Sequence, residues 1–216
     1  MSLHLRAAKL PQSEYDKKVA AALDRLYATK RGEAISVERS SLRVVVMSDL
    51  HRGARDGADD FERAERAYSA ALGWYLEERY ALWLLGDVEE LWENDVKEVV
   101  PDAYKHLLKL EREFAEARGG PGLRRFWGNH DLDWADEDSR AEHLDEYLAG
   151  SPVEEGLCVE VREDSKRLGI IFFAHGHQGT DSSDRFRGIS RFFVRRIWRK
   201  VQASQGWLLA WTPLWR

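Results

Sequence analysis

The chain has 216 residues, 44% of them hydrophobic and 33% charged, and a formal net charge of -5. This composition excludes global disorder and fits one soluble globular domain with a sizeable core. A single cysteine, Cys158, excludes an internal disulfide framework and a cysteine zinc cluster. No apolar run reaches the ~18 residues of a membrane-spanning helix, and the N-terminus lacks a secretory h-region, so we expect a cytoplasmic protein.

Helical and strand patterns alternate along the chain. In chain order we expect helix 13–29, strand 42–47, helix 59–80, strand 82–85, helix 101–118, strand 123–127, helix 137–148, and strands 157–161 and 168–174. The strands are short and rich in apolar residues, as in a sheet that is buried on both faces. The order of elements therefore predicts an α/β fold.

Four of the expected strands end in residues that suit a metal ion. These residues are Asp49 and His51, Asp87, Asn129 and His130, and His175. Because the carboxyl ends of strands in an α/β sheet gather at one edge, we expect these side chains to lie close together. Oxygen and imidazole ligands in such a set are typical of a two-metal hydrolytic site.

Each candidate ligand at the strand ends has a side chain that suits a particular place in a two-metal site. Asp49 and His51, two positions apart at a strand end, can converge on one divalent ion. Asp87 has two carboxylate oxygens and can bridge that ion to a second one about 3.5–4 Å away. Asn129 and His175 suit the second ion, which leaves His130 free to reach substrate. Asp131 is expected to orient His130, because a carboxylate commonly fixes a histidine tautomer.

The ordered motifs resemble those of the calcineurin-like metallophosphoesterase superfamily, whose pattern includes D-x-H, G-D-x-x-[DE] and G-N-H-[DE]. All three match here, and the resemblance covers residues 42–184. The flanks at 86–92 and 175–181 are most similar to the branch that contains UDP-2,3-diacylglucosamine hydrolase. The resemblance implies a four-layer α/β/β/α sandwich that lacks its last strands.

The resemblance also implies roles for the residues. Two divalent ions, with Mn2+ favoured, would be held by Asp49, His51 and Asp87 and by Asp87, Asn129 and His175. The ions would activate a hydroxide for attack on phosphorus, with His130 stabilising or protonating the departing oxygen. The expected activity is metal-dependent hydrolysis of a phosphodiester or pyrophosphate, with a lipid-linked nucleotide as the favoured substrate. His177 and Asp181 are candidate substrate contacts.

The chain departs from the family pattern after His175. The family carries a further G-H-x-H motif there, whereas no histidine follows His177. We therefore expect the last strands and two metal ligands to be missing, with weak metal binding and reduced catalysis. In an alternative register, residues 174–177 are a degenerate G-H-x-H, and His143 is the single histidine that precedes it.

The sequence divides into an N-terminal helical extension (1–40), a metallophosphoesterase domain (41–184) and a basic aromatic helical tail (185–216). The tail contains eight Arg or Lys residues and no Asp or Glu. Its apolar and basic residues suit an anionic membrane surface, so a peripheral position on the inner face of the membrane is one expectation. Packing of the tail onto missing strands is the other. A nucleic-acid partner is disfavoured, because the rest of the chain is acidic.

These observations leave two functions open. The first is the metal-dependent phosphoester hydrolase described above. The second is a truncated or degenerate family member without efficient catalysis, which binds a partner or a membrane through residues 185–216.

Overall fold

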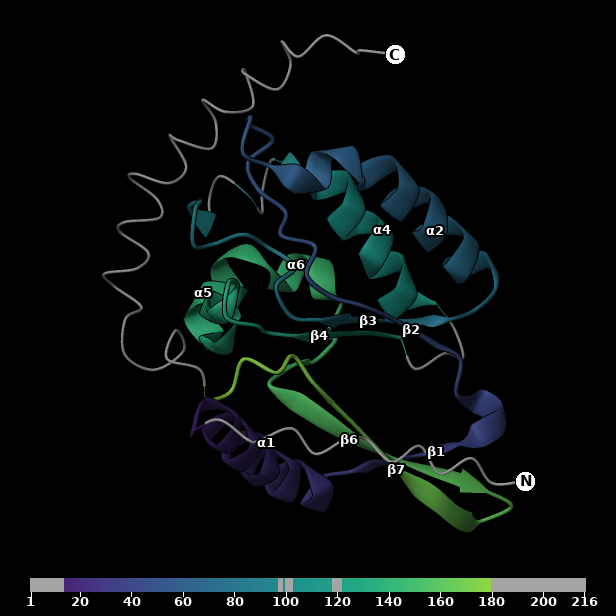
Figure 1. Cartoon of the computed structure of the whole chain (residues 1–216). Coiled ribbons are helices and arrows are strands. Elements are labelled where there is room, and N and C mark those ends of the chain that lie inside the picture. Colours follow the sequence, from purple (N-terminus) through teal and green to yellow (C-terminus); the bar gives the residue numbers. More distant parts are fainter. Residues whose placement is uncertain (1–13, 97–98, 100–102, 118–121, 180–216) are drawn as a thin grey trace, which may run out of the picture.

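The computed structural model describes residues 14–96, 99, 103–117 and 122–179. These residues form a mixed α/β fold with two sheets (Figure 1). In the first sheet all strands are parallel, in the order β2 (Val44–Met47), β3 (Ala81–Leu85), β4 (Leu123–Phe126) and β5 (Val153–Glu154). The second sheet has the order β1 (Ile35–Glu38), β6 (Gly156–Glu163) and β7 (Lys166–Ala174).

The helices lie on the outer faces of the two sheets (Figure 1). On one side, α2 (Glu65–Glu77) and α4 (Lys105–Glu116) cover the parallel sheet. On the other side, α1 (Glu14–Gly32) packs against the second sheet, with the rings of Tyr27 and Phe172 edge to face at 5.5 Å. Two short helices, α5 (Glu137–His143) and α6 (Asp145–Leu148), precede β5.

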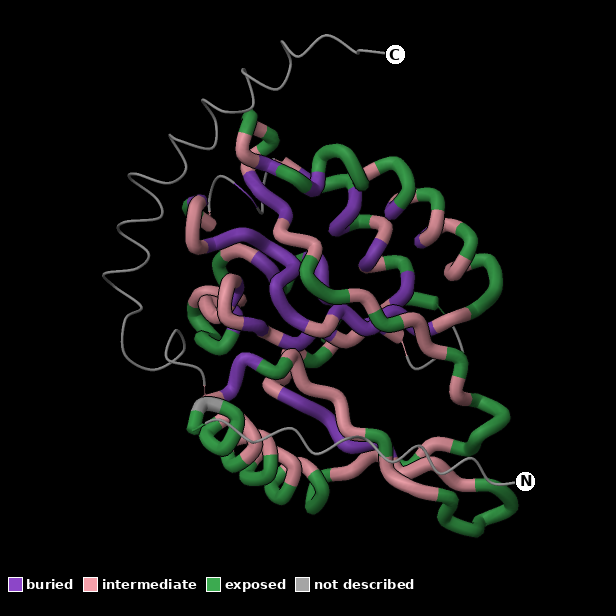
Figure 2. The backbone as a smooth tube through the Cα atoms, viewed as in Figure 1, coloured by how far each residue is buried: buried purple, intermediate pink, exposed green. Residues whose placement is uncertain are grey.

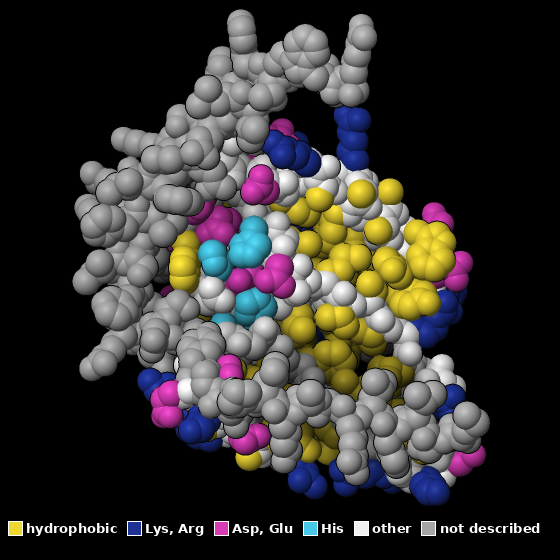
Figure 3. Space-filling view, in the orientation of Figure 1, with side chains coloured by type: hydrophobic (Ala, Val, Ile, Leu, Met, Phe, Trp, Pro, Cys, Tyr) yellow, Lys and Arg dark blue, Asp and Glu magenta, His cyan; other side chains and the backbone are white. Residues whose placement is uncertain are grey.

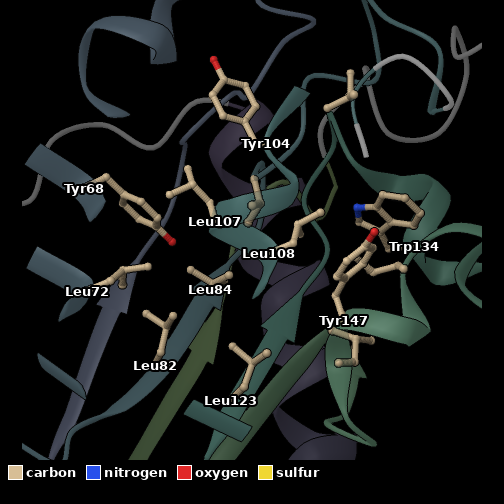
Figure 4. Packing of buried hydrophobic residues seen from close by; sticks show 14 of the residues in the cluster. Tyr68, Leu72, Leu82, Leu84, Tyr104, Leu107, Leu108, Leu123, Trp134 and Tyr147 are labelled. Atoms are coloured by element: carbon tan, nitrogen blue, oxygen red, sulfur yellow. The ribbon is translucent and has the colours of Figure 1, made fainter. Parts of the chain in front are cut away.

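Strand β3 shows why the parallel sheet is buried on both faces. Leu82 and Leu84 point to the helices and join the large core cluster that includes Leu72 and Leu107 (Figure 4). The alternate residues Ala81 and Trp83 point to the other sheet and pack with Leu157 and Val159. Because successive side chains of a strand point to opposite faces, one apolar run serves both layers. The buried segments in Figure 2 run through this central layer.

The structure confirms the α/β class and corrects parts of the element assignment. The predicted helical extension is not purely helical, because residues Ile35–Glu38 form β1, which pairs parallel with β6. The predicted helix 59–80 begins instead as a 3-10 turn, η2 (Asp60–Arg63), since the Asp59 side chain accepts a hydrogen bond from the Phe61 N–H. The two-residue strand β5 was also missed.

Candidate metal centre

The loops that follow β2 and β3 run side by side and continue the parallel pairing beyond the strands. The Asp49 N–H donates to the Gly86 carbonyl at 3.1 Å, and the His51 N–H donates to the Asp87 carbonyl at 3.0 Å. The Arg52 N–H then donates to the Val88 carbonyl at 2.9 Å. These hydrogen bonds fix the register in which the first two motifs face one another.

The backbone of both loops adopts the left-handed conformation at the candidate ligands. Asp49, His51 and Asp87 have φ angles of 55°, 48° and 52°. Non-glycine residues rarely occupy this region, and strained positions of this kind cluster at functional sites. Gly86, with a φ of 81°, also lies under the His175 ring, where an added Cβ would come within 2.6 Å of a ring carbon. Glycine at 86 therefore allows both the turn and the approach of His175.

Asp87 lies at the centre of the site. Its Oδ1 accepts a hydrogen bond from the His130 N–H at 2.8 Å. Its Oδ2 lies 3.9 Å from His51 Nε2 and 3.5 Å from His175 Nε2. Asp49 Oδ1 lies 3.5 Å from the same His175 nitrogen. In Figure 3 these histidine and acidic side chains gather on one face of the molecule.

The described residues form two groups of side chains whose ligand atoms all lie within 4.8 Å of one another, and both contain Asp87. One group is Asp49, Asp87 and His175, and the other is His51, Asp87 and His130. The sharing of Asp87 agrees with its predicted bridging position. Asp49 Oδ1 also lies 4.0 Å from His51 Nε2, so Asp49 is close to His51, as predicted, as well as to His175. Carboxylate oxygens with imidazole nitrogens suit Mn2+, Fe2+ or Zn2+.

Asn129 lies half-buried in the loop after β4, between Gly128 and His130. Its backbone carbonyl accepts a hydrogen bond from Trp92 Nε1 at 2.6 Å. Gly128 lies against the Asp87 carboxylate, where a Cβ atom would collide with Oδ1. The close approach of the loops after β3 and β4 therefore depends on glycine at 128.

Glu90 orients the histidines, a role that for His130 was expected of Asp131. Its Oε2 lies 2.9 Å from His51 Nδ1 and 2.7 Å from His130 Nδ1. Each imidazole thus donates from Nδ1 and keeps Nε2 for a metal ion or a substrate. Burial acts to raise the pKa of Glu90, but the hydrogen bonds from His130 and His51 outweigh it and lower the pKa to about 2. The hydrogen bond to Glu90 in turn raises the pKa of His51.

The prediction that Asp131 orients His130 was wrong. Asp131 is fully buried, and its carboxylate accepts hydrogen bonds from the backbone N–H groups of Asp87, Val88 and Gly128 at 3.1, 2.8 and 2.6 Å. It therefore holds the loop after β3 against the loop after β4. Burial and the charge of Glu89 raise the pKa of Asp131 to about 7, although the Gly128 N–H acts to lower it.

Trp92 is a second residue that the sequence did not single out. Its ring stacks on the His130 imidazole with centroids 4.3 Å apart and an interplanar angle of 15°. Its backbone N–H donates to Glu90 Oε1 at 3.1 Å. Trp92 therefore contacts both His130 and the carboxylate that orients it. Its position two residues after Glu90, in the segment 86–92, was the sequence feature that could have pointed to it.

A network of buried ion pairs lies beneath the loops. Glu89 Oε2 accepts hydrogen bonds from Arg125 Nη2 at 2.5 Å and from Trp134 Nε1 at 2.8 Å. Arg52 lies 3.8 Å from Glu89 Oε1 and pairs with Glu111 of α4. The four charged side chains are each about 1% exposed. The network links both loops to β4 and α4.

The remaining predicted residues do not join the metal groups. His177 is buried, with its Nδ1 3.3 Å from His175 Nδ1, and lines a hollow of about 650 Å³ against α1. His143 ends α5, with Nε2 3.6 Å from Glu142, and the groups found among the described residues do not include it, so the alternative register gains no support. Asp181 and the tail 185–216 lie outside the described residues.

Comparisons with known proteins give no family: no protein-family model matches the chain, and no curated protein matches it. Among the residues that the structure describes, no helix has the length and apolarity that a membrane crossing requires.

Proposed function

We propose that the chain is a metal-dependent phosphoester hydrolase of the calcineurin-like metallophosphoesterase class. The observation that carries the proposal is the convergence of His51 Nε2 and His175 Nε2 on Asp87 Oδ2, at 3.9 and 3.5 Å. Two sheets stacked between helices, with the site at the ends of parallel strands, also agree with what the motif resemblance implies.

The donor set fits a pair of divalent ions, with Mn2+ favoured by the resemblance. Asp49, Asp87 and His175 would hold one ion, and His51 with Asp87 the other, while Asn129 adds a neutral oxygen. When bound, such a pair neutralises phosphate charge and supplies a nucleophile at neutral pH. His130 would then face the substrate and exchange a proton with the departing oxygen at Nε2, because Glu90 engages its Nδ1.

The finer substrate assignment rests on the sequence. A phosphodiester or pyrophosphate, with a lipid-linked nucleotide favoured, is proposed from the motif flanks. A cytoplasmic location, with peripheral attachment to the inner face of the membrane, is proposed on the same basis. The contrasting role as a partner- or membrane-binding module depends on residues 185–216, and no described contact favours it.

Substitution of Asp87 tests the proposal. We expect Asp87→Asn to reduce Mn2+-dependent hydrolysis of bis(4-nitrophenyl) phosphate at least 100-fold, because the shared ligand loses its charge. Asn keeps the shape that accepts the His130 N–H, so the loop should still fold, which circular dichroism can verify. The matched control is Asp24→Asn, an exposed residue of α1, which should keep full activity. Metal-dependent turnover that survives in Asp87→Asn would contradict the proposal.

A further inference from the structure

A hollow of about 600 Å³ opens directly beside the candidate metal centre. It is lined by the residues of the site, Asp49, His51, Glu90 and His130. Its lining also includes Leu50, Phe61 of η2 and the alanines at 58, 64 and 67. In Figure 3 the apolar surface of the molecule begins next to the histidine and acidic cluster.

The apolar part of the lining contains several small side chains, with Asp60 next to Phe61 in the sequence. Ala64 and Ala67 lie three residues apart at the start of α2 and therefore on one helix face. The rings of Phe61 and Tyr68, which also line the hollow, are buried and pack edge to face, with centroids 5.5 Å apart. The alanine methyl groups are small and the two aromatic rings are buried, so the hollow has room for an organic group next to the site. Such a group could bury apolar surface here.

The charges around the hollow are of one sign. Among the described residues that line it, the charged side chains other than histidine are Asp49, Asp60, Glu90 and Glu93, with no Lys or Arg. A second anionic group placed away from the metal ions would lie near these carboxylates. No Lys or Arg among the described lining residues would pair with that group. An uncharged apolar group would meet no such repulsion and would gain binding free energy from each buried methylene.

We propose that this hollow, defined by its alanine wall, binds an uncharged apolar group of the substrate next to the phosphoester. This inference rests on the proposed function and narrows its substrate class. The substrate group that contacts the alanines of the hollow is apolar. A second phosphate or a carboxylate does not bind at that position.

Phosphonates that cannot be hydrolysed test the inference on the full chain loaded with Mn2+. Calorimetry would compare methylphosphonate, hexylphosphonate and 6-phosphonohexanoate, which share one head group. We expect hexylphosphonate to bind at least tenfold more tightly than methylphosphonate, and the terminal carboxylate to abolish that gain. Equal binding of the methyl and hexyl compounds, or retention of the gain with the carboxylate, would overturn the inference.

Two variants of α2 test whether the preference for hexylphosphonate over methylphosphonate arises in the hollow. Ala67→Phe fills it and should reduce the hexyl-to-methyl affinity ratio to about one. Ala70→Phe adds the same side chain at an exposed position one turn further along, outside the lining residues, and should keep the wild-type ratio. A ratio that falls equally in both variants, or in neither, would overturn the assignment.

Failure of this inference can be told apart from failure of the proposed function. If phosphodiesters are hydrolysed without a chain-length preference, only the apolar site is wrong. If the phosphonates bind with the expected preference while no phosphoester is hydrolysed, only the catalytic proposal is wrong. Absence of binding by all three compounds would overturn both.

Discussion

Glu90 shows how one side chain can organise a site built from separate loops. Its carboxylate takes hydrogen bonds from His51 and His130, which lie 39 and 40 residues from it in the sequence. An ionised Glu90 carboxylate can accept a hydrogen bond from Nδ1–H of each histidine, and these hydrogen bonds lower the pKa of Glu90 to about 2. A pH-dependent contribution to stability follows.

We expect Glu90 to stabilise the metal-free protein at neutral pH and to lose that effect in acid. Because its pKa is lowered to about 2 in the folded chain, from 4.5, the stabilisation is complete above pH 4.5 and declines as the pH falls towards 2. Between pH 6 and 3.5 the difference is about 1.5 kcal/mol. Urea unfolding of wild type and Glu90→Gln at both pH values measures it. Equal pH dependence in the two proteins would show that Glu90 does not contribute.

Trp92 acts on the same imidazole through its ring. We predict that Trp92→Leu lowers turnover about tenfold, because His130 loses the stacked face that fixes its plane. Mn2+ affinity should change little, since Trp92 is outside the candidate ligand groups of the described residues. Trp92→Phe keeps an aromatic face and should recover most of the turnover. A loss of metal affinity in Trp92→Leu that matches its loss of turnover would show a general effect on the loops instead.

At the scale of the elements, the buried ion network connects the loops to β4 and α4. Glu89 receives hydrogen bonds from Arg125 and Trp134, and Arg52 joins it to Glu111. Burial acts to raise the pKa of Glu89, but the two arginines outweigh it and keep the pKa below its usual value. Removing one partner of such a network leaves a buried charge without compensation.

We therefore predict that Glu89→Gln lowers the free energy of unfolding by about 3 kcal/mol. The control is Glu163→Gln, which breaks the exposed pair with Arg39 at 2.9 Å. That change should cost less than about 1 kcal/mol, because water already screens exposed charges. Urea denaturation of both variants at neutral pH measures the difference. Similar small losses in the two proteins would mean that the network adds little to stability.

The element scale also shows the limits of sequence patterns. The strands β2, β3, β6 and β7 were predictable because each contains a continuous or alternating apolar run, whereas β4 has two arginines between Leu123 and Phe126. The strand β1 alternates apolar and polar residues over only two repeats, and β5 has only two residues, too few for a period to emerge. Their pairing with β6 and β4 is a long-range contact, which a local pattern cannot encode.

At the scale of the whole molecule, the sequence predicted that the candidate metal ligands gather at the ends of the strands. Asp49, His51, Asp87 and His175 were expected together, because all follow predicted strands, and the structure brings them within 4.0 Å of a neighbour in the site. The residue that orients His130 is Glu90, not Asp131 as expected. The difference depends on the left-handed turns after β2 and β3, which leave no periodic signal in the sequence.

The central claim is that the loops after β2, β3, β4 and β7 build one site for two metal ions around Asp87. Elemental analysis of the purified chain, after Mn2+ loading and removal of excess metal, tests it most directly. We predict two Mn2+ ions per wild-type chain and at most one in Asp87→Asn, because that residue is shared by both ligand groups. Retention of one ion or none by the wild-type chain would contradict the claim.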